Sequence, residues 1–114
     1  MNNEAVREFC MSLPHATEKI QWGDDLVFKI GGKMFAVLVL IPAPVWISFT
    51  ASPEEFAELT ERANIIPAPY SARYFWVALK TRDALRPTEL KQCLRRSYDL
   101  VREKLPRKVL ASLK

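Results

Sequence analysis

The sequence predicts an α+β fold, a two-layer sandwich in which an antiparallel sheet carries the N-terminal and C-terminal helices on one face. Three observations lead to this prediction. A helical hydrophobic period opens the chain, a longer one closes it, and between them lie alternating apolar runs separated by glycine and proline. With 114 residues, 49% of them hydrophobic, the chain is expected to form a single domain over residues 1–114.

The first helix is predicted over residues 2–13, where apolar residues recur at spacings of three and four and an asparagine stands ready to cap the first turn. Pro14 ends this pattern. Residues 17–22 are then expected to form a short strand or an extended segment that leads into the sheet.

A tight hairpin is predicted by two apolar runs, residues 26–30 and 34–40, on either side of Gly31-Gly32. Two glycines supply the positive φ angles that two-residue hairpin turns require. If Ile30 pairs with Lys33, a regular register pairs Phe28 with Phe35 and Leu26 with Val37 on the core face, and Lys29 with Met34 on the other.

A third strand is predicted over residues 45–50, which alternate with the period of a half-buried strand. Ser52 and Pro53 then provide an N-cap and a first-turn proline for a helix that ends near Arg62. An acidic outer side is expected on this helix and would repel a phosphate backbone: Glu54, Glu55, Glu58 and Glu61.

The remaining elements follow a proline-rich connection over residues 65–70. Residues 75–80 alternate again and predict a further strand. Pro87 opens the last helix, whose apolar stripe runs to Leu105, and Pro106 stops it or begins a short terminal turn.

Charge is distributed unevenly along a chain whose net charge is +4. Residues 1–79 hold 6 Lys and Arg against 9 Asp and Glu, a net of −3, whereas residues 80–114 hold 11 against 4, a net of +7. No apolar run approaches the roughly 20 residues that cross a bilayer, and the polar opening is unlike a secretory signal. We therefore expect a cytoplasmic protein without a membrane partner, in which Cys10 and Cys93 are buried reduced thiols.

Enzymatic function finds no support among the motifs of the sequence. No GxSxG, P-loop, HExxH or dinucleotide-binding pattern is present, and the single histidine, His15, lies in a predicted turn. Asp24 and Asp25 are adjacent, so on a strand they would point to opposite faces rather than act as a pair. The sequence therefore predicts a non-enzymatic protein with no catalytic residues, no metal site and no cofactor.

Residues 22–35, WGDDLVFKIGGKMF, carry a recognisable pattern of WGD, an acidic residue, a strand, GGK and an aromatic residue. This stretch resembles the MmcQ/YjbR family of small bacterial proteins. Further matches cover nearly the whole chain: Pro14-His15, Thr17-Glu18, the segment IIPAPYSARYFW at residues 65–76, Ser97-Tyr98 and Leu105-Pro106. The resemblance implies a frataxin-like (CyaY-like) sandwich and DNA binding by a double-wing architecture.

The candidate site is the sheet face opposite the helices, where aromatic and basic side chains are expected to gather. By strand parity this face collects Lys29, Met34, Trp46, Trp76 and Lys80, joined by Tyr70 and Arg73 from the preceding loop. Rings beside cations suit stacked bases and phosphates. The leading prediction is a monomer that binds DNA or another nucleic acid through this face, the hairpin tip and the last helix: Lys29, Lys33, Arg73, Trp76, Lys80 and Arg95.

Two alternatives stay open at this point. An aromatic pocket beneath the proline-rich loop would instead bind a small molecule or a peptide, lined by Trp22, Tyr70, Tyr74 and Trp76. An exposed apolar patch on the open sheet would favour a protein-interaction domain. In a further interpretation the loop covers Trp46 and Trp76, and both are simply core residues.

Overall fold

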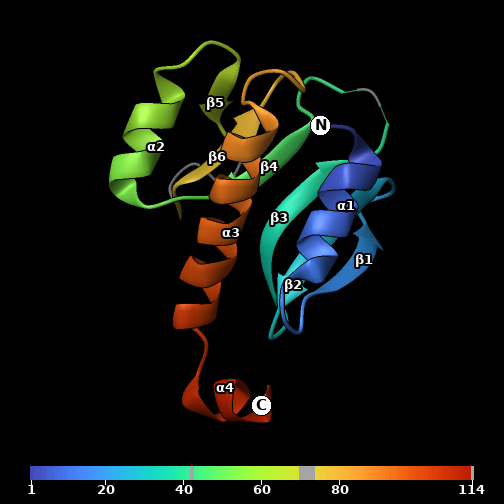
Figure 1. Ribbon diagram of the computed structural model, residues 1–114, viewed down its shortest axis with the longest axis vertical. Coiled ribbons are helices and arrows are strands. Elements are labelled where there is room, and N and C mark those ends of the chain that lie inside the picture. The colour runs from blue at the N-terminus through green and yellow to red at the C-terminus, as the bar shows by residue number, and fades with distance from the viewer. Residues whose placement is uncertain (42, 70–73, 114) are drawn as a thin grey trace.

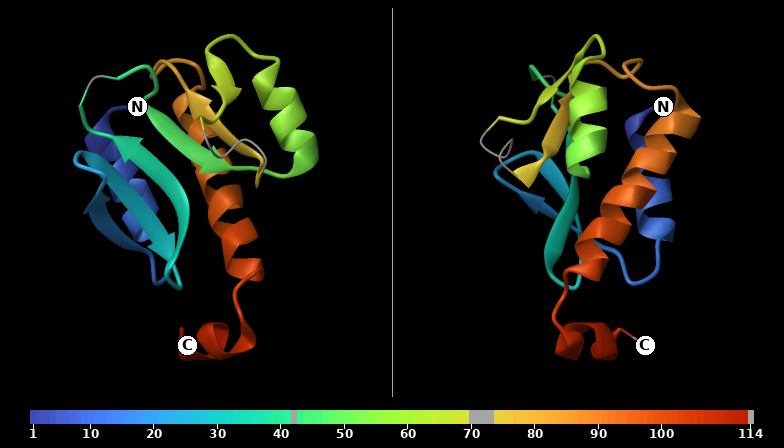
Figure 2. Two further views of the ribbon diagram at one scale, coloured as in Figure 1. Left: turned by 180° about the vertical axis from the view of Figure 1, so that it is seen from behind. Right: turned by 90° about the vertical axis from the view of Figure 1, so that its left-hand side faces the viewer.

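The computed structural model describes residues 1–41, 43–69 and 74–113. Its elements are, in order, α1 (Asn3–Ser12), β1 (Thr17–Gln21), β2 (Asp25–Ile30), β3 (Lys33–Val39), β4 (Ile47–Thr50), α2 (Pro53–Thr60), β5 (Ile65–Pro67), β6 (Trp76–Leu79), α3 (Pro87–Glu103) and α4 (Arg107–Ser112). The six strands form one antiparallel sheet in the order β1-β2-β3-β4-β6-β5. Helices α1 and α3 lie side by side on one face of it (Figures 1 and 2), which confirms the predicted α+β sandwich.

The hydrophobic core lies between the sheet and these two helices. From the sheet it receives the side chains of alternate residues on each strand, and from α3 it receives the predicted stripe, including Leu90, Leu94 and Tyr98. Both cysteines are free and buried, as predicted. Burial raises the pKa of Cys10 to about 12, so this thiol stays protonated and unreactive at neutral pH.

One strand, β5, lies in the segment that the sequence predicts to be a connection. It pairs with β6 at the edge of the sheet, from Ile65 opposite Leu79 to Pro67 opposite Val77. Proline lacks a donor and is tolerated on an edge strand, which is why a proline-rich segment can still belong to the sheet. The strand is only three residues long, too short for an alternating pattern to reveal it.

The β2–β3 hairpin departs from the predicted register because β3 contains a β-bulge. Ile30 pairs with Lys33 and Lys29 with Met34, as predicted, but the register then shifts, and Phe28 pairs with Ala36. Phe35 is the extra residue on the bulged strand. The predicted pairs Phe28 with Phe35 and Leu26 with Val37 are therefore wrong, and Leu26 lies opposite Leu38.

The bulge places Phe35 in the core and brings it against α3. The Phe35 ring meets the edge of the Tyr98 ring at 5.5 Å between centroids, with the planes at 86°, and it also contacts Phe28. The Tyr98 hydroxyl donates a hydrogen bond of 2.5 Å to the carbonyl of Pro14, just beyond α1. One side chain of α3 thus ties the bulged strand to the end of the first helix.

Beyond the bulge, β3 and β4 separate, and a serine of α3 takes the place of the missing ladder. The two strands are paired only from Ala36–Phe49 to Leu38–Ile47. At the next position, the buried hydroxyl of Ser97 donates to the Phe35 carbonyl at 2.6 Å and accepts from the Thr50 amide at 3.1 Å. Figure 2, left, shows α3 beyond the diverging ends of the two strands.

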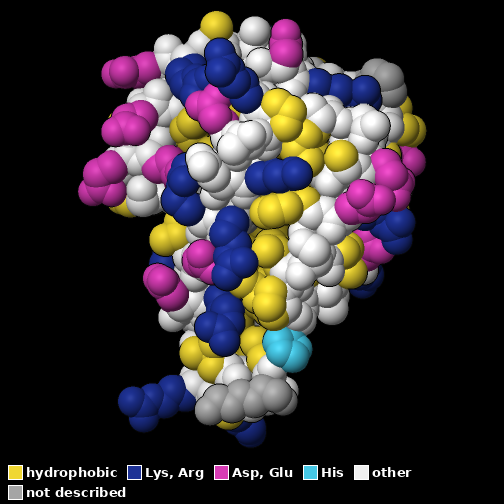
Figure 3. All heavy atoms as spheres, viewed as in Figure 1, with side chains coloured by type: hydrophobic (Ala, Val, Ile, Leu, Met, Phe, Trp, Pro, Cys, Tyr) yellow, Lys and Arg dark blue, Asp and Glu magenta, His cyan; other side chains and the backbone are white. Residues whose placement is uncertain are grey.

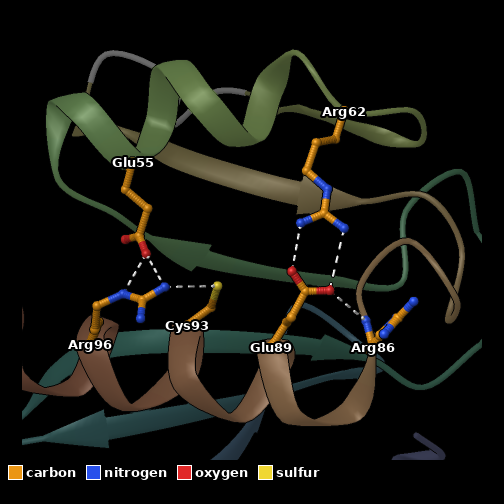
Figure 4. A network of polar contacts seen from close by, with 6 residues as sticks. All are labelled: Glu55, Arg62, Arg86, Glu89, Cys93 and Arg96. Carbon is orange, nitrogen blue, oxygen red and sulfur yellow. Dashed lines mark hydrogen bonds and ion pairs between the residues drawn. The ribbon is translucent and has the colours of Figure 1, made fainter.

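Helix α2 is joined to α3 by two ion pairs (Figure 4). Arg62 binds Glu89 at 2.8 Å, and Arg96 binds Glu55 at 2.5 Å. The sequence predicts that Glu55 belongs to a solvated acidic face, and this prediction is wrong. The Glu55 carboxylate points toward α3 and is largely buried. The pKa of Glu89 is lowered by its hydrogen bond to Arg62, which keeps this pair charged at neutral pH.

The tip of the β2–β3 hairpin packs against the C-terminal segment. Gly31 has a φ of +58°, and a Cβ atom on it would lie 2.6 Å from Leu105 Cδ1 and 2.9 Å from Val109 Cγ1. Gly32 has a φ of +82° but nothing within 4 Å of its Cβ position. One side of the predicted tip is therefore covered, and the tip is less free to approach a ligand than the sequence suggests.

We predict that Ser97→Ala lowers the free energy of unfolding by about 1–3 kcal/mol, because a carbonyl and an amide lose their shared partner inside the protein. Urea denaturation with an unchanged m-value measures this loss. The matched control is Ser12→Ala, whose exposed hydroxyl bonds only to the carbonyl three residues earlier and should cost no more than about 0.5 kcal/mol. Equal effects of the two substitutions would contradict the assigned role of Ser97.

The two glycines of the hairpin tip provide a second comparison. Both alanine variants carry a strained positive φ, at a cost of about 1–2 kcal/mol each. Gly31→Ala should lose a further 1 kcal/mol or so, because its Cβ collides with Leu105 and Val109 and must displace α4. Hydrogen exchange should accelerate in α4 for Gly31→Ala and stay unchanged for Gly32→Ala; the same exchange pattern in both variants would rule out this packing.

Candidate functional site

The sheet face opposite α1 and α3 is not covered by any helix of the described chain (Figure 2). The register fixes which side chains this face carries, because paired residues of neighbouring strands point the same way. One row crosses the sheet from Val27 through Val37 and Ser48 to Ala78. Lys29 beside Met34 and Trp76 beside Thr50 lie on the same face.

An apolar trough of about 580 Å³ follows this face. Apolar and aromatic side chains make up most of its lining, and Asp25 is the only charged one among the described residues. The lining consists of Trp22, Asp25, Met34, Val37, Val39, Val45, Ser48, Ala68, Pro69 and Trp76. Its size lies in the range of sites that bind small molecules or single bases.

A second hollow of about 500 Å³ opens where β3 and β4 diverge. We call it the lysine hollow, because Lys33 of the hairpin and Lys104, just after α3, both line it. Its other lining residues are Met34, Thr50, Tyr74, Trp76, Leu100, Val101 and Leu105. Met34 and Trp76 line the trough as well, so the two hollows adjoin at these side chains, and we call the two hollows together the groove.

Trp22 stands at the far end of the trough in an unusual backbone conformation. It lies in the turn between β1 and β2, with a φ of 49°, and its side chain is 66% exposed. A large non-glycine residue rarely adopts a positive φ, and such strain is often kept at functional sites. An exposed indole held this way provides a stacking surface at the mouth of the trough.

Two hydrogen-bond acceptors lie next to each other at this end. Gln21 pairs with Asp25 across β1 and β2, so their side chains share the open face. The Oε1 atom of Gln21 is buried and has no hydrogen-bond partner in the described structure. Burial, and to a lesser extent repulsion from Asp24, raises the pKa of the Asp25 carboxyl above its usual value.

The structure brings together several of the predicted site residues. Lys29, Lys33 and Trp76 all lie on or beside the groove. Of the residues predicted for an aromatic pocket, Trp22 and Trp76 line the trough, whereas Tyr74, 59% exposed, lines the lysine hollow. Tyr70 and Arg73 lie outside the described residues.

Lys80 does not line either of these two hollows. It follows β6 and lines a third hollow with Trp46 and Arg82, which shares Val39 and Val45 with the trough. The sequence predicts Trp46 on the open face, and this prediction is wrong. Trp46 precedes β4, and its side chain turns toward the helices. It is 7% exposed, and its Nε1–H donates to Asn3 Oδ1 at 2.7 Å.

Arg95 lies on the opposite side of the sheet, where the basic side chains of α3 form a column beside an apolar strip (Figure 3). It pairs with Asp99 at 3.3 Å and stacks over the ring of Tyr98, with its Cζ atom 5.6 Å from the ring centroid. Helical spacing places Lys91 and Arg102 on the same stripe of α3. The predicted nucleic-acid residues therefore fall on two separate surfaces.

Sequence reasoning missed four members of the open face. Lys104 enters the site only because the sheet splits, and Ser48 lies in the middle of the trough. Lys19 pairs with Val27, and Asp25 with Gln21, so both also lie on this face. Strand parity carried through β1 would have found Lys19 and Asp25, but it could not have found Lys104, which belongs to no strand.

Neither a metal cluster nor a membrane-spanning helix is found in the part of the chain that the structure describes. No three His, Cys, Asp or Glu side chains gather there as metal ligands would. In residues 1–41, 43–69 and 74–113, no helix is both long and apolar enough to cross a bilayer. His15 lies in an exposed turn with a φ of 62°.

Comparisons with known proteins agree with the motifs of the sequence. The model of a family described as YjbR matches residues 11–100. The chain is similar to the crystal structure of Deinococcus radiodurans protein DR2400, described by the domain DUF419, with 29% identity, a TM-score of 0.82, and 95% of this chain and 84% of that one covered. A protein from Pseudomonas syringae shares the fold at 21% identity and a TM-score of 0.75, covering 89% of this chain and 99% of its own. No curated protein matches.

We predict that Asp25→Asn raises the urea midpoint at pH 7. A carboxyl whose folded-state pKa is raised stabilises the fold when protonated, and this stability is lost as the pH rises through that pKa. The advantage of the variant should therefore disappear near pH 3, where the wild-type carboxyl is also neutral.

Asp24→Asn is the matched control, since Asp24 is exposed in the same turn and its effect should be smaller. A lower midpoint for Asp25→Asn at pH 7 would show that the Asp25 carboxylate supports the fold rather than straining it.

Proposed function

We propose that this chain, which belongs to the YjbR family, binds single-stranded nucleic acid along the open face of its sheet and catalyses no reaction itself. The observation that carries the proposal is the position of Trp76, at the junction between an apolar trough and a hollow lined by two lysines. An aromatic ring beside cations is the arrangement that single strands require. We further propose that the protein acts as a monomer in the cytoplasm.

Phosphates are assigned to the lysine side of the groove. Lys33 and Lys104 line one hollow from two different elements, and Lys29 pairs with Met34, which lines the same hollow. Lys19 extends this basic edge onto β1. Each phosphate contact releases condensed counterions, so the affinity for a strand bound here should fall as the salt concentration rises.

Bases are assigned to Trp76 and to the apolar wall of the trough. A base stacked on an aromatic side chain gains roughly 1–3 kcal/mol, whatever its identity. The concave, mainly apolar lining suits a flat ring. Single strands, whose bases are free to turn outward, suit this surface better than double helices.

The helix side of the molecule is less suited to phosphates, although the net charge of the last third of the chain lies there. Arg95 is already paired with Asp99, and Arg96 with Glu55. Acidic side chains lie close to the basic column in Figure 3, and Glu54 and Glu58 of the neighbouring helix α2 are exposed. Binding of a backbone along α3 would have to break these pairs or pass close to the carboxylates.

A small-molecule or peptide ligand is the second candidate, and the trough itself favours it. A hollow of about 580 Å³ with one carboxylate and an apolar lining resembles a ligand pocket as closely as a base-binding site. Salt separates the two functions, because binding in an apolar pocket is nearly indifferent to ionic strength, whereas phosphate contacts are not.

The proposal predicts that Lys33→Ala with Lys104→Ala weakens binding of a fluorescein-labelled single strand. The slope of log K against log salt should become shallower by about 1.4, the value for two lost phosphate contacts on a single strand. Fluorescence anisotropy over a series of salt concentrations measures both the affinity and the slope, and quenching of tryptophan emission reports on stacking in the same samples.

The matched control removes two positive charges from the other side of the sheet, by Lys91→Ala with Arg102→Ala. This variant should keep the wild-type slope. Equal losses in the two double variants would mean that only net charge matters, and a loss confined to the α3 variant would move the interface to the helices. Absence of salt-sensitive binding in the wild-type protein would refute the proposal and leave the small-molecule function.

A further inference from the structure

We propose that the Trp22 end of the trough is a guanine-selective pocket, in which the side chain of Asp25 reads the Watson–Crick edge of the base. This inference rests on the proposed function and adds a base preference to it. It starts from Asp25, the single charged side chain among the described residues that line the trough, and from the exposed Trp22 in the same lining.

The acceptors are placed by the register of the first two strands. Gln21 and Asp25 are directly opposite one another on β1 and β2, which puts their Cβ atoms about 4.5–5.5 Å apart on the open face. The buried Gln21 Oε1 lacks a partner in the described structure, but Gln21 does not line the trough, so the carboxylate of Asp25 is the acceptor that a base in the trough can reach.

Among the nucleobases, guanine supplies the best match. Its Watson–Crick edge carries two adjacent donors, N1–H and the N2 amino group, and this fork fits the two oxygens of a carboxylate as a bidentate pair. Adenine, cytosine and thymine each offer one donor group on that edge, next to an acceptor that the carboxylate would repel.

Trp22 supplies a surface on which such a base can stack. It precedes Asp25 by three residues, lines the same trough and is 66% exposed. Trp22 and the following Gly23, with a φ of 89°, both have positive φ angles in this turn. The Trp22 indole and the Asp25 carboxylate line the same hollow. Val39 and Val45 complete the apolar lining at this end.

This pocket is separate from the phosphate-binding end. β3 runs from Lys33 to Val39, about 20 Å at the usual rise per residue, and the two hollows lie toward opposite ends of it. A strand lying along the groove would therefore contact the lysines and Asp25 with different nucleotides. Base preference and salt dependence should then respond to different substitutions.

The test compares labelled oligothymidylates of about eight nucleotides that carry one internal guanine, hypoxanthine or adenine. Hypoxanthine keeps N1–H but lacks the amino group, so it isolates the second donor. We expect the guanine strand to bind at least 10-fold more tightly than the other two, within the range of a bidentate base contact. Free guanosine monophosphate is titrated in parallel to test whether guanine binds when it is not part of an oligonucleotide.

Asp25→Asn should abolish the guanine preference, because the asparagine amide presents a donor to the donors of the base. The control, Asp24→Asn, should retain it, and so should the Lys33→Ala, Lys104→Ala double variant, although that variant binds every strand more weakly. Circular dichroism checks that each variant is folded.

The outcomes separate this inference from the function on which it rests. Strand binding that is independent of the base, or a preference that survives Asp25→Asn, overturns the guanine pocket and leaves strand binding in place. Asp25-dependent binding of guanosine monophosphate without binding of any oligonucleotide supports the pocket and removes the strand. If the protein binds neither guanosine monophosphate nor any oligonucleotide, both the guanine pocket and the proposed strand binding are overturned.

Discussion

The hydroxyl of Ser97 is the contact on which the shape of the site depends. It stands where β3 and β4 would otherwise continue their ladder, and it satisfies the Phe35 carbonyl and the Thr50 amide at once. The strands can therefore part without leaving buried polar groups unpaired. Their separation leaves room for the lysine hollow, which Lys104 lines from just beyond the end of α3.

The bulge at Phe35 and the serine act together. The bulge turns an additional aromatic ring into the core, where Tyr98 meets it edge-on, and it directs the strand away from β4. Ser97 and Tyr98 are neighbours on α3, so one turn of helix closes the core and shapes the groove. At the other end of the groove the fold retains costly features, a tryptophan at positive φ and a carboxylate whose pKa is raised by burial, and such costs are typical of binding sites.

The fold class, the main elements and the family could be predicted from sequence because each has a local signal, such as Gly31-Gly32 for the hairpin or Ser52-Pro53 for the start of a helix. The bulge could not, since Phe35 fits either register equally well as an apolar residue. Trp46 was assigned to the wrong face because strand parity was extended one residue beyond β4. Lys104 and the orphaned oxygen of Gln21 depend on tertiary packing, which no spacing rule reports.

The split sheet, and not the basic column on α3, is the proposed binding surface. The most direct test follows the amide and indole resonances of the isotopically labelled protein as a guanine-containing single strand is added. We predict shifts in β3, β4 and β6 and at the indoles of Trp22 and Trp76, with the buried indole of Trp46 unchanged. Shifts confined to the exposed face of α3 and to α1 would contradict the account.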